Sequence, residues 1–539
     1  MKTCIILSLL LLLSHSFRAQ TFTDSNLPIV VITTPVGQTI MDDPRITCHM
    51  GVIDNGPGIR NYLTDPFTNY DGNIAIEIRG STSQQYPKKS YGFETQDALG
   101  ANLPVALLGM PVENDWILYG PYPDKTLIRN VLTFDLARKM GNYASGTRFC
   151  ELVIDNDYRG IYVMMERIKV DGDRVNITKL HTPNLWDDTL TGGYIVKVDK
   201  LTGEVGYTWT SNYNNEVVFQ FHDPEFDEIN ALQASYMENF INEFEAALDG
   251  PSFADATLGY HNYIDPTSFH DFFILQELGR TVDGYRSSSF LHKDKDGFSW
   301  NAKLVAGPMW DFNLSFGNAD YCNADQTTGW QYNFDQICGN FSTSIPFWWK
   351  RLQEDPVYAN GLRCRWEELR QGPLHTDNIN AFIDSVANYI EEARIRNFQR
   401  WPIIGVYVNW NGFVGQSYQE DLNYLKSYME NRSIWIDNNL PAFCNLDIPD
   451  HEHIPEYHRA WPNPFNDNVS IGFSTFQTGT IIVEIVDMFG RLIHKESLGL
   501  KSPGAHALSF EYLNMEQGNY LYMVRQDGSI MYSGKLIKL

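Results

Sequence analysis

The chain has 539 residues and a formal charge of −25, with 66 acidic against 41 basic side chains. Nucleic-acid binding needs clustered Lys and Arg to neutralise phosphates, and the sequence shows no such cluster, so we expect no nucleic-acid partner. Hydrophobic residues make up 43% of the chain and aromatic residues 14%, which is enough for large packed cores in more than one domain and argues against a disordered protein.

Residues 1–20 are typical of a secretory signal peptide. Lys2 precedes an apolar run from Ile5 to Leu13, and the segment ends near Ala19 or Gln20. This run is shorter than a membrane-spanning helix, and no later segment approaches roughly twenty uninterrupted apolar residues. We therefore expect a secreted or surface-attached mature chain without a transmembrane segment.

The first part of the mature chain is predicted to be rich in strands. The apolar run 28–34 predicts one strand, the period-two alternation of Ile74, Ile76 and Ile78 predicts another, and residues 88–94 predict a third. Residues 151–168 show strand, polar turn and strand again, with Asp155 and Asn156 in the turn.

Helical patterns come later. Asp124 is placed to cap a helix that carries Leu132 and Leu136 on one face and ends before Gly141. Further helical patterns cover residues 224–249, 266–278 and 346–439, so the middle and later body is predicted to be mainly α.

Prolines and charges replace the apolar periodicity at residues 445–460, as expected of a linker. The last eighty residues alternate short strands with Gly, Asn and Asp turns, which predicts a small β-sandwich. The predicted organisation is a signal peptide at 1–20, a body at 21–444, a linker at 445–460 and a C-terminal domain at 461–539.

Six cysteines remain after the predicted signal peptide: Cys48, Cys150, Cys322, Cys338, Cys364 and Cys444. An even number in an exported chain predicts disulfides. Cys322 and Cys338 are the best candidates for a local bridge, and the other pairings stay open. No CxxC or His-rich spacing favours a metal site.

Five blocks within residues 70–320 resemble the CotH family of spore-coat-type atypical protein kinases. They are IEIRGSTSQQYPKKSYGFE, NDWILYGPYPDKTLIRNVLTFDLARKMG, ELVIDNDYRGIYVMMERIKVDGDRVNI, ELGRTVDGYRSSSFLHKDKDG and AGPMWDFNLSFGNA. The tail resembles the type IX secretion sorting domain of Bacteroidetes-type bacteria through WPNPF at 461–465, DMFGR at 487–491 and the strand GNYLYMV.

The resemblance implies an α+β fold with an atypical protein-kinase-like body, made of a β-rich small lobe and a mainly helical large lobe, followed by the small β-sandwich. It also implies ATP and Mg²⁺ or Mn²⁺ as cofactors, transfer of the γ-phosphoryl group to Ser or Thr of an exported or cell-surface protein, and recognition of the tail by the type IX secretion machinery.

The resemblance also assigns the metal and catalytic residues. Asp311 in GPMWDFN holds a DFG-like position and would bind the metal, with Asn313 as a second oxygen ligand. Asp283 in TVDGYR would accept the substrate hydroxyl or bind metal. Helix caps and an Asp-Gly turn are the structural alternatives. Ordinary kinases place an Asn after the base, whereas Ser287–Ser289 stand here.

Candidate nucleotide-binding residues come from four segments: Arg79, Ser81 and Ser83, then Lys88 and Lys89, then Arg129, and finally Glu166. The two lysines are expected to point to opposite faces of a strand, so one at most would reach the phosphates. The alternative for Arg129 is a position in a solvated first helical turn, and the alternative for Glu166 is a position at an exposed strand end.

Two other functions stay open. The body is alternatively a catalytically inactive kinase-like module that binds a protein or glycan, for which Trp330, Trp348 and Trp349 are candidates, although core packing is the commoner role of such residues. A polysaccharide hydrolase with two carboxylates is compatible with the abundant Asp and Glu. Nucleotide binding distinguishes the kinase from both.

Overall fold

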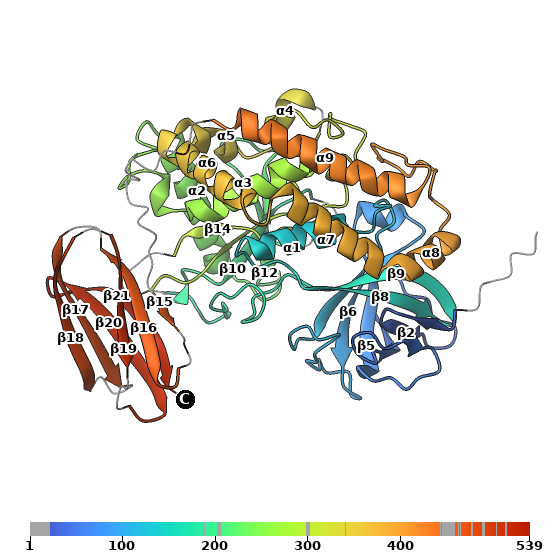
Figure 1. The fold of residues 1–539 in the computed structure, drawn as a ribbon, viewed down its shortest axis with the longest axis horizontal. Coiled ribbons are helices and arrows are strands. Elements are labelled where there is room, and N and C mark those ends of the chain that lie inside the picture. The colour runs from blue at the N-terminus through green and yellow to red at the C-terminus, as the bar shows by residue number, and fades with distance from the viewer. Residues whose placement is uncertain are drawn as a thin grey trace, which may run out of the picture.

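The computed structural model describes residues 22–186, 189–201, 206–297, 302–339, 341–441 and 444, and most of 459–538. The predicted signal peptide and nearly all of the predicted linker lie outside these residues. Strand-rich structure comes first, helices follow, and strands return at the C-terminal end (Figure 1), which confirms the α+β class.

A closed β-barrel opens the fold. Its strands follow one another in the order β2-β3-β5-β6-β7-β9-β8, with β2 and β8 parallel and every other pair antiparallel. The strands are β2 (Ile29–Thr33), β3 (Ile46–Ile53), β5 (Tyr70–Arg79), β6 (Ser90–Gln96), β7 (Asp115–Tyr119), β8 (Thr147–Ile154) and β9 (Asp157–Glu166). The short strands β1 (Asp24–Ser25) and β4 (Asn61–Tyr62) pair beside it.

The predicted alternation of apolar and polar residues distributes the side chains of β5 over its two faces. Ile74 and Ile76 lie inside the barrel core, whereas Glu77 and Arg79 point out of it toward the rest of the body. Asp155 and Asn156, both with positive φ, make the tight turn between β8 and β9. The predicted strands of this part are confirmed, except that Lys88 and Lys89 precede β6 instead of belonging to it.

A second antiparallel sheet, which the sequence analysis did not predict, lies within the mainly helical part. Its order is β11-β12-β10-β13-β14. The strands are β10 (Tyr194–Val198), β11 (Thr208–Thr210), β12 (Val218–Asp223), β13 (Ser289–Lys293) and β14 (Leu304–Ala306). Strands of this length carry too few residues for a clear period of two, and this sheet joins segments about a hundred residues apart.

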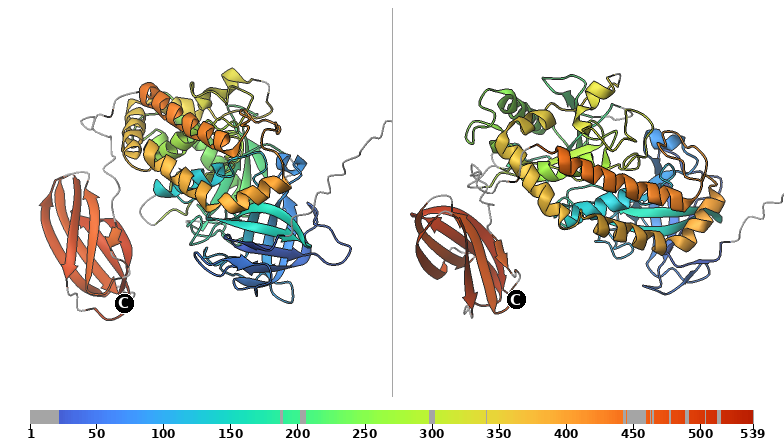
Figure 2. Two further views of the ribbon diagram at one scale, coloured as in Figure 1. Left: turned by 45° about the vertical axis from the view of Figure 1, so that its right-hand side comes forward. Right: turned by 45° about the horizontal axis from the view of Figure 1, so that its top comes forward.

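Most of the helices cluster around this sheet, whereas α8 lies beside β9 of the barrel (Figures 1 and 2). They are α1 (Arg129–Lys139), α2 (Ala231–Asp249), α3 (Pro266–Gly279), α4 (Phe334–Ile337), α5 (Trp348–Arg351), α6 (Pro356–Arg370), α7 (Thr376–Tyr389), α8 (Glu391–Arg400) and α9 (Tyr418–Asn439). Short 3₁₀ turns are η1 (Thr82–Gln85), η3 (Tyr260–Asn262), η4 (Gln331–Asn333) and η5 (Leu352–Glu354).

Helix α3 is buried along its whole length, because apolar side chains surround it. The Asp265 carboxylate caps its first turn by accepting from the backbone N–H groups of Thr267 and Ser268. Near its end, Glu277 forms a buried ion pair of 3.0 Å with Arg432 of α9. Trp348 and Trp349 are buried in the same core, as core packing requires, so they offer no exposed binding face.

The C-terminal domain is a two-layered β-sandwich, as predicted (Figure 1). One layer has the order β15-β16-β19 and the other β18-β17-β20-β21. The strands are β15 (Arg459–Trp461), β16 (Asn468–Thr475), β17 (Gly479–Asp487), β18 (Leu492–Lys501), β19 (Gly504–Glu511), β20 (Gly518–Gln526) and β21 (Ser529–Lys538). Tyr520 packs in its core and Lys535 is exposed.

Two disulfides are formed, Cys322–Cys338 and Cys364–Cys444, so the predicted local bridge is confirmed. Cys48 and Cys150 are free and buried, which corrects the expectation that all six cysteines pair. The register explains the difference. Cys48 lies just beyond the Thr33 end of β2 and Cys150 just beyond its Ile29 end. About 3.3 Å per residue keeps them farther apart than the roughly 7 Å limit for a disulfide.

No helix in the described ranges is both long enough and apolar enough to span a bilayer.

Candidate functional site

A cavity of about 380 Å³ lies between the barrel and the second sheet. The barrel contributes charged side chains of β5 and β7 and the rings of Phe93 and Trp116, and the second sheet contributes β10–β13. Aromatic rings line the opposite wall, namely Tyr207, Phe221, Phe226, Phe290 and Trp310. A lining that combines aromatic rings with many charged side chains suits a ligand that has both an aromatic ring and an anionic end.

Most cations around this cavity are already paired. Arg45 forms an ion pair with Glu77 at 3.0 Å and a second one with Glu94. Arg167 pairs with Glu225 at 2.7 Å and Asp115 at 3.5 Å.

Arg79, at the end of β5, differs from these cations. Within the described part of the chain its guanidinium has no hydrogen-bond or ion-pair partner, and it lies 5.6 Å from the centre of the Trp310 ring. Burial lowers the pKa of Arg79 to about 10, and the positive charge of Arg167 acts in the same direction. A bound anion would therefore complete the contacts of Arg79.

Asp311 follows Trp310 directly and has a positive φ of 61°. Non-glycine residues seldom adopt this conformation, and where they do the surrounding structure must hold it. Burial, together with the negative charges of Asp283 and Asp199, raises the pKa of Asp311 to about 7, whereas the positive charges of Arg79 and Lys200 oppose this rise. The predicted Asp311 and Asp283 are therefore brought together, and Asp199, at the end of β10, joins them.

This group of carboxylates fits a hard divalent cation such as Mg²⁺ or Mn²⁺, because carboxylate oxygen is the donor that these ions prefer. In the described residues, no three His, Cys, Asp or Glu side chains stand close enough together to hold a metal ion by themselves. Mg²⁺ usually takes one or two protein carboxylates together with phosphate oxygens, so the arrangement fits a cation that arrives with a phosphorylated ligand.

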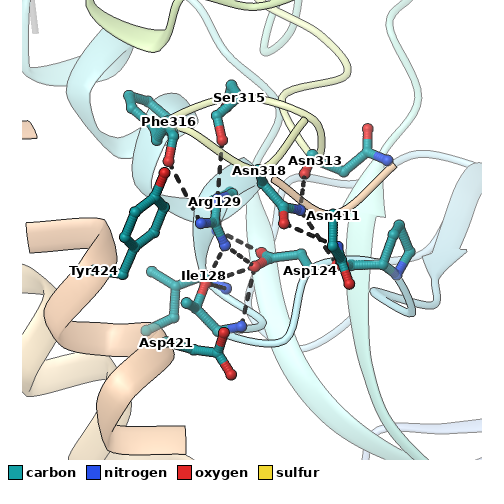
Figure 3. Close-up of polar contacts among 12 residues, drawn as sticks. Asp124, Ile128, Arg129, Asn313, Ser315, Phe316, Asn318, Asn411, Asp421 and Tyr424 are labelled. Carbon is teal, nitrogen blue, oxygen red and sulfur yellow. Dashed lines mark hydrogen bonds and ion pairs between the residues drawn. The ribbon is translucent and has the colours of Figure 1, made fainter. Parts of the chain in front are cut away.

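Helix α1 holds the loop that follows Asp311. The Asn130 side-chain oxygen accepts a hydrogen bond of 2.7 Å from the backbone N–H of Phe312. Arg129 donates from Nε to the Ser315 carbonyl at 3.0 Å and forms a buried ion pair of 2.5 Å with Asp124 (Figure 3). Arg129 is thus occupied within the protein, and it ties the helix to the cleft instead of lying in a solvated first turn.

Asp124 supports the start of α1 from a distance. Asp124 was predicted to be the N-cap of this helix, but the N-cap residue is Ile128. Its carboxylate nevertheless accepts from the Arg129 backbone N–H at 2.9 Å. Asn313 joins the network through its backbone carbonyl, which accepts from the Asn318 side chain at 2.8 Å (Figure 3).

The loop between β5 and β6 carries Ser81 and Ser83 at η1. Lys200, next to Asp199, donates to Thr82 Oγ1 of this loop at 3.0 Å. The loop therefore contacts the segment that carries one of the three carboxylates.

Of the seven predicted nucleotide-binding residues, Arg79 lines the cavity and the other six do not. Lys88 is buried, and its ammonium group donates to Asn397 of α8 at 2.8 Å. Lys89 donates to the backbone carbonyl of Gln84. Glu166 is buried and accepts from the Gly146 backbone N–H at 2.7 Å and the Tyr143 hydroxyl at 3.2 Å, so it is not an exposed strand end.

Asp199, Arg167 and Lys197 border the site, and the sequence analysis missed them. The run YIVKVDK carries a signal that would have found Asp199, because a carboxylate at the end of an apolar strand is unusual. Arg167 directly follows the predicted site residue Glu166, but no sequence motif marks Arg167 itself as a site residue.

Comparison with solved structures gives only weak likenesses. An immunoglobulin-like protein from Pseudomonas aeruginosa is 8% identical, with a TM-score of 0.12, over 16% of this chain and 84% of that one. The alkylpurine DNA glycosylase AlkC from Pseudomonas fluorescens, bound to DNA containing an abasic site analog, is 12% identical, with a TM-score of 0.12, over 36% of this chain and 56% of that one. Among curated proteins no match was found.

Family comparison covers most of the chain. Residues 459–539 match the secretion system C-terminal sorting domain, which implies export by the type IX secretion machinery to the cell surface or beyond. Residues 76–436, which include the barrel from β5 onward, the second sheet and nearly all of the helices, match the CotH kinase protein family. The chain therefore belongs to the CotH family and carries a C-terminal sorting domain.

Proposed function

We propose that this protein is an exported protein kinase that transfers the γ-phosphoryl group of ATP to a Ser or Thr hydroxyl of an exported or cell-surface protein. In this proposal the barrel serves as the small lobe, the second sheet and the helices serve as the large lobe, and ATP occupies the cavity between them.

The observation that carries the proposal is the closeness of a cation that lines the cavity, Arg79, and a carboxylate, Asp311, that directly follows the lining residue Trp310. Arg79 is a half-buried cation without a carboxylate partner among the described residues, and Asp311 is a half-buried carboxylate near two others. A phosphate chain with its cation would satisfy both groups. The aromatic wall formed by residues such as Tyr207 and Phe221 suits the base at the other end.

Each side chain then has a defined task. Arg79 binds phosphate oxygens, and Asp311 and Asp199 hold the cation, with Asn313 as a further candidate ligand. The cation, when bound, neutralises negative charge that builds up on the phosphate oxygens. Asp283 orients the acceptor hydroxyl and takes its proton as the oxygen bonds to the γ-phosphorus and the bond to the β-phosphate oxygen breaks.

The test is titration of the exported chain with ATP in the presence of Mg²⁺ or Mn²⁺, followed by calorimetry and thermal unfolding. Ligand at a hundred times its Kd should raise the free energy of unfolding by about 2.7 kcal/mol. Asp311→Asn should abolish the metal-dependent part of binding, whereas Asp377→Asn, a change of an exposed carboxylate on α7, should leave it intact.

Transfer itself is measured with γ-labelled ATP and a library of Ser- and Thr-containing peptides. Label in peptides that depends on Asp283 supports the kinase. Nucleotide binding without transfer would favour the catalytically inactive module, and absence of nucleotide binding with either metal would overturn the proposal.

A further inference from the structure

Arg286 is held in a single orientation beside the proposed catalytic Asp283. Its Nη2 lies 3.1 Å from Asp283 Oδ1. Its Nη1 donates to Thr343 Oγ1 at 2.6 Å, and its Nε donates to the Val282 carbonyl at 2.9 Å. All three nitrogens of the guanidinium therefore donate within the protein, which leaves the group little freedom to turn.

Two aromatic rings support the same guanidinium. Its central carbon lies 4.3 Å from the centre of the Phe334 ring and 4.7 Å from that of Phe341. The two rings meet at 56°, and the Arg286 side chain is only 4% exposed. A cation over aromatic faces and away from water is held more firmly than an exposed ion pair.

Asp283 by contrast reaches solvent, because its side chain is 31% exposed. Its Oδ1 faces Arg286, and among the described residues no hydrogen bond is donated to its Oδ2. The negative charge of Asp283 acts on Asp311 and Asp199, so its carboxylate lies near these two side chains. One oxygen is thus fixed by the protein and the other is left for a ligand.

We propose that Arg286 is a positioning residue: from its pocket of Phe334, Phe341 and Thr343 it holds Asp283 Oδ1, so that Oδ2 points at the hydroxyl of the acceptor. This inference rests on the proposed function, in which Asp283 takes the hydroxyl proton. It assigns Arg286 no contact with ATP or with the acceptor.

The pocket of Arg286 comes from a segment remote from the strands of the site. Phe334 lies within the loop that the Cys322–Cys338 disulfide closes, and Phe341 and Thr343 follow that loop. Phe334, Phe341 and Thr343 therefore influence the position of Asp283 through Arg286. The Cys322–Cys338 disulfide contributes to the geometry of the proposed site by closing the loop that carries Phe334.

The experiment compares the full exported chain with Arg286→Met and Arg286→Ala. Arg351→Met is the matched control, because Arg351 also lies over a phenylalanine ring, at 3.7 Å from Phe253, and also pairs with an acid three residues away. Both Arg286 variants should bind ATP and metal within about twofold of the unchanged chain. Their kcat for transfer should fall at least about tenfold, within the range that a positioned general base contributes.

Rescue of kcat by added guanidinium ion distinguishes positioning of Asp283 from a purely structural role, because a structural role predicts no rescue. The added ion should restore part of the kcat of Arg286→Ala, whose emptied pocket keeps both rings, and should do nothing for Arg351→Met. An unchanged kcat in both Arg286 variants would overturn the inference.

Crystal structures of the unchanged chain and Arg286→Met separate this inference from the proposed function. If the unchanged chain binds no ATP, the proposed function fails, yet the orientation of the Asp283 carboxylate still tests Arg286. A carboxylate that turns in the variant supports its positioning by Arg286. A carboxylate that keeps its place overturns it.

Discussion

The Asn130 side chain accepts a hydrogen bond of 2.7 Å from the backbone N–H of Phe312, and so fixes the peptide that follows Asp311. Asn130→Leu removes the acceptor and leaves a buried N–H without a partner, which typically costs about 1–3 kcal/mol. We expect that loss in the free energy of unfolding, measured by urea denaturation, together with weaker metal-dependent ATP binding, because Asp311 would leave its positive-φ conformation more easily.

Asn262→Ala is the control for this change, since Asn262 is exposed on η3. It removes only an exposed hydrogen bond from the Asn262 side chain to the Thr257 carbonyl, far from the Asp311 loop in sequence, and should leave metal-dependent ATP binding unchanged. Equal ATP affinity in Asn130→Leu and the unchanged chain would show that the hydrogen bond does not hold the Asp311 loop.

Arg79→Met is expected to weaken ATP binding at least about tenfold. A hydrogen bond to a charged group contributes about 1.5–3 kcal/mol, and a factor of ten corresponds to about 1.4 kcal/mol. Adenosine lacks phosphates, so its affinity should stay the same. Calorimetry with both ligands checks the difference, and a parallel loss of adenosine binding would instead indicate general damage to the cavity.

Local patterns predicted much of the fold and part of the site. The alternation in β5, the turn between β8 and β9 and the capped helix α3 each depend on neighbours within a few residues. Asp311 and Asp283 were found in the same way, from short motifs with a recognisable resemblance. Their grouping with Asp199 was not, because Asp199 follows a strand that lies more than eighty residues earlier in the sequence.

Where the predicted role of a residue was wrong, its actual role depends on contacts with residues distant in the sequence. The paired lysines suggested a phosphate site, but Lys88 bonds to Asn397, which lies 309 residues later. Glu166 looked like a strand end at a pocket, but Tyr143 and the Gly146 backbone enclose it. Spacing along the chain carries no information on such partners, since these helices and loops approach only after folding.

Cys322→Ser is expected to lower phosphoryl transfer several-fold without abolishing ATP binding. The Cys322–Cys338 bridge closes a loop with a sequence separation of 16, and a bridge of about this length stabilises by roughly 3 kcal/mol. Its loss should loosen Phe334 and with it Arg286. Hydrogen exchange over residues 334–343, measured beside transfer, should rise.

Cys364→Ser breaks the other bridge, Cys364–Cys444, and is the matched control. It should leave exchange in residues 334–343 unchanged. Identical effects of the two variants on transfer would show that the Cys322–Cys338 bridge has no particular connection with Asp283.

Lys88 should make the stability of the fold rise with pH above neutrality. Burial lowers the pKa of Lys88 to about 7, although the charges of Cys150 and Glu151 oppose this shift. An exposed lysine has a pKa of about 10.4, so between about pH 7 and 10.4 the unfolded chain binds the proton more tightly than the folded one. The free energy of unfolding contributed by Lys88 therefore increases with pH across this window.

Lys88→Met removes this contribution, because methionine does not titrate. Asn397 still accepts from the Ile161 backbone N–H at 3.2 Å in the absence of the ammonium group. Urea denaturation at pH 7 and pH 9.5 should show a smaller rise in stability for the variant than for the unchanged chain. Burial raises the pKa of Cys150 to about 12, but Cys150 is present in both proteins, so the difference between their pH profiles reports Lys88. Parallel pH profiles of the two proteins would mean that Lys88 keeps an ordinary pKa in the fold.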